Sequence, residues 1–312
     1  YLIEFDKEFR SPRIESIIAD MYAERYRDSL ALEYYNKALK LDPQYAPAMY
    51  GKGEVYRLKG DFANYFAQIK PFFTSPGVDS RRKTEYLKQV FQVPNFIQRF
   101  RKQVDSIMLS IEQTHPADTT ANIFLAAYWG QGGDNERCKR LLKANYDLYP
   151  EKHSTMFQYV VAIYQLEEWE NLEAAATEAL ERFPGDPDLT QLRGIARFQL
   201  KKTEKAIESY REMEKIAMAN KDTALLVTSY SVLGDLHYEK KDSKGAYAYY
   251  KKALKLNPDE NGVLNNYAYY LSLEGKNLKL AYEMSRKTIE SEPDNPTYLD
   301  TFGWILFLMD KP

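Results

Sequence analysis

Apolar and small residues recur every three or four positions along most of the chain, in blocks separated by short polar turns. Residues 227–258 show this pattern clearly. The first half of this stretch places Tyr230, Leu233, Gly234 and Leu236 on one helical face. After a turn at 241–242 the spacing resumes with Ala246, Tyr249, Tyr250, Ala253, Leu254 and Leu256. The pattern predicts two amphipathic α-helices joined by a turn.

The predicted helix pair is repeated along the chain. Residues 31–45 (ALEYYNKALKLDPQY) and 246–260 (AYAYYKKALKLNPDE) agree at nine of fifteen positions. Prolines recur at steps of 34 or 35 residues, from 116 to 150 to 184 and from 258 to 293. If each proline lies near the end of a unit, the units begin at 12, 46, 85, 119, 153, 187, 227, 261 and 296, with insertions near 74–80 and 217–224. A period of this length is typical of helical repeat proteins.

Helix-start signals support this register. Ser11-Pro12, Asp186-Pro187 and Asn295-Pro296 each place a capping side chain before a proline. That order is common at the beginning of a helix, because proline fits the first helical position and the preceding side chain accepts from free backbone N–H groups. All three pairs fall at the predicted start of a unit.

Residues at fixed positions of the units resemble those of tetratricopeptide (TPR) repeats. Position 8 is small, positions 20 and 27 favour alanine, and position 24 favours tyrosine. The residues concerned are Ala19, Gly53, Ala126, Gly194, Gly234 and Gly303 at position 8, Ala31, Ala206 and Ala246 at 20, Tyr35, Tyr210 and Tyr250 at 24, and Ala38, Ala179 and Ala253 at 27. The resemblance implies an all-α fold, a right-handed superhelical solenoid of antiparallel helix pairs with about eight units and partial ends.

The units divide into segments of different regularity. We expect residues 1–11 to be the end of a preceding truncated repeat, 12–116 to hold the N-terminal units, and 117–312 to hold the C-terminal units, with the last one incomplete. In the units that begin at 46 and 85, Tyr65 replaces an expected alanine and Val93-Pro94 interrupts the first helix. A bend or local opening is predicted there. The incomplete last unit leaves an apolar helix, which predicts self-association or coverage by further chain.

Composition narrows the classes of partner and location. The formal net charge of -2 favours neither nucleic acid nor an acidic membrane surface. The apolar run at 302–309 is too short to cross a bilayer. Because the sequence begins at Tyr1, we expect a fragment or a processed product. Residues 264–307 resemble envelope-associated TPR proteins of Gram-negative anaerobes, whose precursors often carry a lipoprotein signal. This implies the bacterial periplasm or an outer-membrane anchor, with the cytoplasm as the alternative.

No residue pattern calls for catalysis, a metal or a cofactor. The three histidines are too far apart for a standard metal-ligand spacing, and neither HExxH nor paired CxxC occurs. The glycines at 51–53 and 130–133 do not follow a predicted strand, so they do not indicate a phosphate loop. Cys138 occupies position 20, where a small buried side chain is expected, and a reactive or metal-binding thiol is the alternative.

The family resemblance also implies a binding surface. In TPR proteins the first helix of each pair lines a concave groove, and ligands usually meet positions 2, 5, 9, 12 and 13. The candidate groove residues at these positions are Tyr50, Phe157, Tyr164, Phe198, Asp235, Tyr238, Asn265, Tyr269 and Trp304. The carboxylate clamp of chaperone-binding TPR domains is absent, because positions 5 and 9 hold pairs such as Ser16 and Asp20.

We therefore expect a non-catalytic scaffold that binds a protein or peptide partner along an aromatic, mildly acidic groove. Rigid aromatic rings with a polar tip suit such recognition, because they lose little side-chain entropy. Two alternatives stay open, which are glycan binding on a TPR-like scaffold and a regulatory segment of a larger enzyme.

Overall fold

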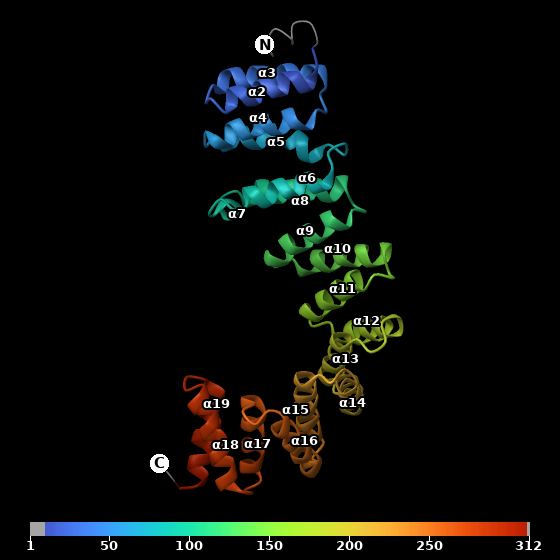
Figure 1. Cartoon of the computed structure of the whole chain (residues 1–312), viewed down its shortest axis with the longest axis vertical. Helices are drawn as coiled ribbons and strands as arrows, with labels where there is room; N and C mark the ends of the chain where they lie inside the picture. The colour runs from blue at the N-terminus through green and yellow to red at the C-terminus, as the bar shows by residue number, and fades with distance from the viewer. Residues whose placement is uncertain (1–9, 311–312) are drawn as a thin grey trace. The chain divides into compact units, whose positions relative to one another are not determined.

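The computed structural model describes residues 10–310, which form α-helices and turns without a β-strand (Figure 1). The predicted end of a truncated repeat at 1–11 lies almost entirely outside this range. The first helices of the repeats are α2 (Pro12–Ala23), α4 (Ala46–Leu58), α6 (Ser80–Val90), α9 (Thr119–Gln131), α11 (His153–Gln165), α13 (Pro187–Gln199), α15 (Thr223–Glu239), α17 (Asn261–Leu273) and α19 (Pro296–Leu308). The second helices are α3 (Asp28–Leu41), α5 (Phe62–Thr74), α8 (Arg101–Thr114), α10 (Asn135–Leu148), α12 (Trp169–Arg182), α14 (Thr203–Asn220), α16 (Ser243–Leu256) and α18 (Leu278–Ser291). The short α7 (Phe96–Arg99) precedes α8.

The helix starts follow the register derived from the prolines. Seven of the nine first helices begin at the predicted residue, and only α6 and α15 begin earlier. The predicted caps form, since Ser11 Oγ accepts from the Ile14 N–H at 3.2 Å and Asp186 Oδ1 accepts from the Leu189 N–H at 2.8 Å. Local capping chemistry therefore fixes these boundaries.

Small residues at position 8 allow the two helices of a repeat to approach closely. A Cβ atom added at Gly194 would lie only 2.8 Å from the Tyr210 ring, and one added at Gly234 would lie closer still to the Tyr250 ring. The alanines at positions 20 and 27 are fully buried, as at Ala246. The repeat positions predicted to pack are therefore core positions.

The two predicted insertions take different forms. Residues 75–79 form a loop between α5 and α6. The second insertion is helical instead, because α14 extends to Asn220 and α15 already begins at Thr223. These helices are 18 and 17 residues long, against 13 or 14 in most other repeats. Both predicted insertions are present, the first as a loop and the second as additional turns of α14 and α15.

The third repeat departs from the helix-pair arrangement. Its first helix is short, as Val93-Pro94 predicts, and α7 intervenes before α8. Bulky buried side chains such as Tyr86 and Leu87 occupy α6, whereas regular repeats place glycine or alanine at the helix crossing. Because large side chains hold helices apart, α8 packs directly against α5, and α6 packs against α9. The two helices of this repeat, α6 and α8, therefore do not pack closely on each other, and we call it the opened repeat.

Lys83 on α6 is fully buried within the opened repeat. Its Nζ donates to the Phe73 carbonyl at 2.8 Å and the Ser75 carbonyl at 2.7 Å, both at the C-terminal end of α5. It also donates to Thr114 Oγ1 at 3.2 Å and lies 2.8 Å from His115 Nε2. Burial lowers the pKa of Lys83 to about 8. Carbonyl groups at a helix end thus take the place of a carboxylate partner.

The chain divides into two compact units, residues 1–150 and 151–312. The N-terminal unit has a large core centred on the second to fourth repeats, which includes Phe73, Ile111 and Leu125. The C-terminal unit has cores around Tyr250 and around Met213.

Candidate functional site

Exposed aromatic rings recur at equivalent positions on the first helices of the C-terminal unit. Position 12 is aromatic on α11, α13, α15 and α19, and position 9 is aromatic on α17 and α19. We call these six residues the first-helix aromatic row, which comprises Tyr164, Phe198, Tyr238, Tyr269, Trp304 and Phe307. Tyr164, Phe198, Tyr269 and Trp304 are 37–40% exposed. Five of the nine predicted groove residues belong to this row.

Neighbouring side chains hold the rings of the row in place. Tyr238 on α15 stacks on Tyr270 of α17, with ring centroids 3.7 Å apart and planes at 16°. Tyr270 in turn contacts Tyr269, at 5.7 Å. Trp304 stacks with Phe307 at 5.8 Å. These ring contacts restrict the side chains before a ligand binds, so little side-chain entropy would be lost on binding.

The two predicted polar groove residues are held inside the unit. Asp235 accepts from the Tyr250 hydroxyl at 2.5 Å and from Asn266 Nδ2 at 3.1 Å. Burial raises the pKa of Asp235, although these two hydrogen bonds act in the opposite direction. Asn265 is 5% exposed and donates to Asn266 Oδ1 at 3.3 Å. Both side chains support the α15–α17 packing.

The other two predicted residues lie apart from the row. Phe157 on α11 is half-buried and stacks with His153 at 5.7 Å. Tyr50 belongs to the N-terminal unit, where it contacts the Tyr86 ring edge-on at 4.9 Å. Tyr50 also lines a pocket of about 220 Å³ together with Arg82 and other residues of α4, α5 and α6.

A larger pocket, which the sequence did not reveal, lies along α15. Its volume is about 610 Å³, within the range usual for ligand pockets. Thr228 and Ser231 in its wall occupy positions 2 and 5, which are groove positions of the repeat. Thr223 comes from the extra turn of α15, and Glu260 comes from the connection to α17. The insertion near 217–224 was the only sequence signal for this pocket.

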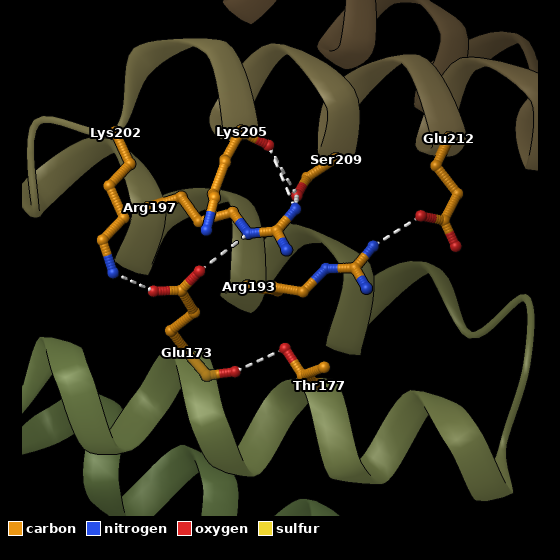
Figure 2. Close-up of polar contacts among 8 residues, drawn as sticks. All are labelled: Glu173, Thr177, Arg193, Arg197, Lys202, Lys205, Ser209 and Glu212. Carbon is orange, nitrogen blue, oxygen red and sulfur yellow. Dashed lines mark hydrogen bonds and ion pairs between the residues drawn. The ribbon is translucent and has the colours of Figure 1, made fainter.

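Charged side chains connect α12, α13 and α14 (Figure 2). Glu173 of α12 accepts from Arg197 Nε at 3.1 Å and from Lys202 Nζ at 2.6 Å. Burial opposes ionisation of Glu173, but these two hydrogen bonds outweigh it and lower its pKa. Arg197 also donates to Ser209 Oγ of α14 at 2.9 Å, and Arg193 pairs with Glu212 at 2.5 Å. The cluster fixes α13, and with it Phe198, between its neighbours.

Within residues 10–310 no group of three His, Cys, Asp or Glu side chains is placed to hold a metal ion. No helix in the same range is long and apolar enough to span a membrane. Cys138 is partly buried next to Gly130, and burial raises the pKa of its thiol. A raised pKa disfavours the reactive thiolate, as a packing role predicts.

Comparison with known protein families agrees with the helix-pair geometry. Two tetratricopeptide repeat models match the chain, one over residues 17–64 and 162–221 and the other over residues 227–260. These segments, which cover less than half of the chain, are similar to tetratricopeptide repeats. The matched segments contain the end of α11, all of α12–α14 and most of α15–α16, and they include Tyr164, Phe198 and Tyr238 of the first-helix aromatic row. Repeats of this family are typical protein–protein interaction scaffolds.

Several solved structures of helical repeat proteins are similar to this chain. One is the Cut9–Hcn1 hetero-tetramer of the APC/C, at 15% identity and TM-score 0.48, covering 94% of this chain and 58% of that chain. Another is the C-terminal part of a TPR repeat-containing protein from Cytophaga hutchinsonii, at 15% identity and TM-score 0.49, covering 80% and 98%. MamA from Desulfovibrio magneticus RS-1 matches at 14% identity and TM-score 0.44, covering 57% and 97%. No curated protein matches the sequence.

Proposed function

We propose that this chain is a non-catalytic scaffold whose first-helix aromatic row binds an extended segment or a helix of a partner protein. The observation that carries the proposal is the recurrence of exposed rings on successive first helices. Four rings of the row are 37–40% exposed although they are large and apolar. Aromatic side chains dominate the energy of many protein interfaces, so a line of them suits a linear ligand.

The pocket along α15 supports the same proposal. It lies on the helix that carries Tyr238, and its wall combines the apolar Val227 with the hydroxyls of Thr228 and Ser231. A pocket of this kind accepts one or two side chains of a bound segment, while the row contacts the remainder. The two features together provide both shape and contact area.

The test begins with selection of 12-residue peptides from a display library on the immobilised chain, followed by fluorescence anisotropy of the selected peptide. The combined variant Tyr164→Ala, Phe198→Ala and Tyr269→Ala should weaken binding by at least 30-fold, because each truncated contact ring contributes about 1 kcal/mol or more. The matched control removes exposed side chains elsewhere, through Tyr26→Ala, Leu58→Ala and Met218→Ala, which are 91%, 75% and 60% exposed. Equal losses in the two variants would remove the row from the binding surface, and binding of glycans on an array in place of peptides would favour the glycan alternative.

We also propose an envelope location, which rests on the sequence resemblance at 264–307 alone. Fractionation of native cells with an antibody against this chain tests it. Recovery in the cytosolic fraction would overturn it.

A further inference from the structure

The N-terminal unit has a further pocket between two of its second helices, α5 and α8. Its volume is about 320 Å³. The floor contains Phe66, Phe73 and Ile107, and the rim contains Lys70 and Lys102. Phe73 is fully buried and Ile107 is 7% exposed, so the pocket reaches the core of the unit.

The opened third repeat explains why this pocket exists. In several repeats the first helix of the next unit packs closely against the preceding second helix, as α13 does against α12 and α15 against α14. In the third repeat α6 is held away from α8 by bulky side chains, and α8 lies against α5 instead. The second helices α5 and α8 therefore lie side by side, and a pocket remains between them. The pocket is therefore a consequence of the irregular repeat.

The surroundings of the pocket are basic. Residues 62–74 and 86–104 contain no aspartate or glutamate, although they contain Lys70, Lys88, Arg99, Arg101 and Lys102. Arg101 pairs with Asp105 at 3.0 Å. Within residues 10–310, neither Lys70 nor Lys102 has an ion-pair partner, and both side chains are exposed. The rim thus offers two ammonium groups without a counter-charge.

Aromatic residues continue from the pocket floor along α7. Phe66 contacts the Phe100 ring at 5.3 Å, and the Arg99 guanidinium lies 5.0 Å from the centre of that ring. Arg99 therefore extends the basic surface next to the apolar floor. Hydroxyl groups of Ser106 and Ser110 complete the wall.

We propose that the α5–α8 pocket is a second docking site, which binds a partner segment carrying an aromatic or aliphatic side chain flanked by carboxylates. The apolar side chain would enter above Phe66 and Ile107, and the flanking carboxylates would pair with Lys70 and Lys102. Charge complementarity selects this occupant, because the chain has a formal net charge of -2 and yet concentrates unpaired cations at this pocket. The site is independent of the first-helix aromatic row.

The experiment uses two libraries of 12-residue peptides, each with one Phe, Trp or Leu. In one library Asp and Glu flank that residue, and in the other Lys and Arg flank it. Both are selected on the immobilised 312-residue chain that carries Tyr164→Ala, Phe198→Ala and Tyr269→Ala, which removes three of the six rings of the row. The affinity of the most enriched peptide is then measured on the wild-type chain by fluorescence anisotropy.

We expect only the acidic library to be enriched. Lys70→Glu with Lys102→Glu should weaken the selected peptide at least tenfold. The control pair Lys40→Glu with Lys255→Glu changes the charge equally at exposed positions away from the pocket, and it should have less than a threefold effect. Ser106→Phe fills the pocket without changing its charge and should also weaken binding tenfold. Raising the salt concentration should weaken binding, because the pairing charges are exposed.

Three outcomes would overturn the proposal. One is that no acidic peptide is enriched. Another is that the two charge-reversal pairs weaken binding equally, which would mean a diffuse effect of net charge. The third is that phosphatidylglycerol vesicles bind with the same dependence on Lys70 and Lys102 while acidic peptides do not, which would identify a lipid surface as the occupant. None of these results changes the test of the first-helix aromatic row.

Discussion

The two units of the chain use the same repeat but place their aromatic rings differently. In the N-terminal unit the rings of Phe62, Phe66, Phe96 and Phe100 pack on one another around α5 and α7. In the C-terminal unit α11, α13 and α19 carry exposed rings at position 12. At that position the N-terminal unit has Ala23, Arg57 and Gly130 in its other repeats, and in the opened repeat the buried Phe96.

The charge of the two units differs as well. Residues 1–150 contain 22 Lys and Arg against 19 Asp and Glu, whereas residues 151–312 contain 21 against 26. One repeat scaffold therefore supports a basic unit whose phenylalanine rings pack on one another and an acidic unit with exposed rings on its first helices. The core positions 8, 20 and 24 build the fold, and positions outside them are free to vary for recognition.

The largest expected difference between the units is in the cost of adding a methyl group at position 8, where the two helices of a repeat approach closely. Gly234→Ala should lower the free energy of unfolding by about 2–3 kcal/mol, because the added methyl group meets the rigid Tyr250 ring. Gly53→Ala in the N-terminal unit should cost only about 1 kcal/mol, since the nearest atom, 2.7 Å away, is the flexible end of Ile69. Urea denaturation measures both. Gly303→Ala is the control, because nothing lies within 4 Å there, and a cost similar to that of Gly234→Ala would contradict the packing argument.

The buried Lys83 should make the stability of the N-terminal unit depend on alkaline pH. Its pKa is about 8 in the folded unit, and an unfolded lysine titrates near its ordinary value of 10.5. Between these values the unfolded chain binds more protons, so the free energy of unfolding should rise with pH, on the order of 2 kcal/mol from pH 7 to pH 10. Urea denaturation followed by fluorescence reports on this unit once Trp169 and Trp304 are replaced by Phe, which leaves Trp129 as the single tryptophan. The difference between wild type and Lys83→Met isolates the lysine, and a difference that is flat with pH would refute the assignment.

The tyrosine at position 24 donates to an aspartate at position 9 in both units. Tyr35 donates to Asp20 at 2.5 Å, as Tyr250 does to Asp235. Tyr250→Phe should cost about 1–2 kcal/mol, because it leaves the half-buried Asp235 with Asn266 alone. Tyr35→Phe should cost less than about 1 kcal/mol, since Asp20 is exposed and water can replace the hydroxyl. Thermal unfolding of the two variants ranks them, and the reverse order would contradict this explanation.

The smallest expected change in the free energy of unfolding comes from substitutions in the turn between the two helices of a repeat. Position 15 has positive φ in both units, with Gly60 at +75° and Lys241 at +64°. Lys241→Gly should raise the free energy of unfolding by about 0.5–1 kcal/mol, because glycine adopts this conformation without a Cβ clash. Gly60→Lys should lower it by a similar amount. Urea denaturation of this pair checks the sign, and a stabilising Gly60→Lys would show that strain at this position is negligible.

The sequence by itself determined the repeat, its register and its core. The period of the apolar residues, the Asp186-Pro187 and Asn295-Pro296 starts and the small residues at position 8 are local signals. They act within one helix or one helix pair, so a single sequence contains enough information to interpret them. The exposed rings at Tyr164, Phe198 and Tyr269 followed from this register.

Tertiary structure decided which helices meet and what remains open between them. Sequence predicted an irregular third repeat, but only the fold shows that α8 then packs against α5 and leaves the pocket beside Lys70 and Lys102. It also turned Asp235 and Asn265 inward, although both occupy groove positions. The reason is physical: helix periodicity is set by residues three or four apart, whereas burial and pocket shape depend on side-chain volumes from helices that are distant in sequence.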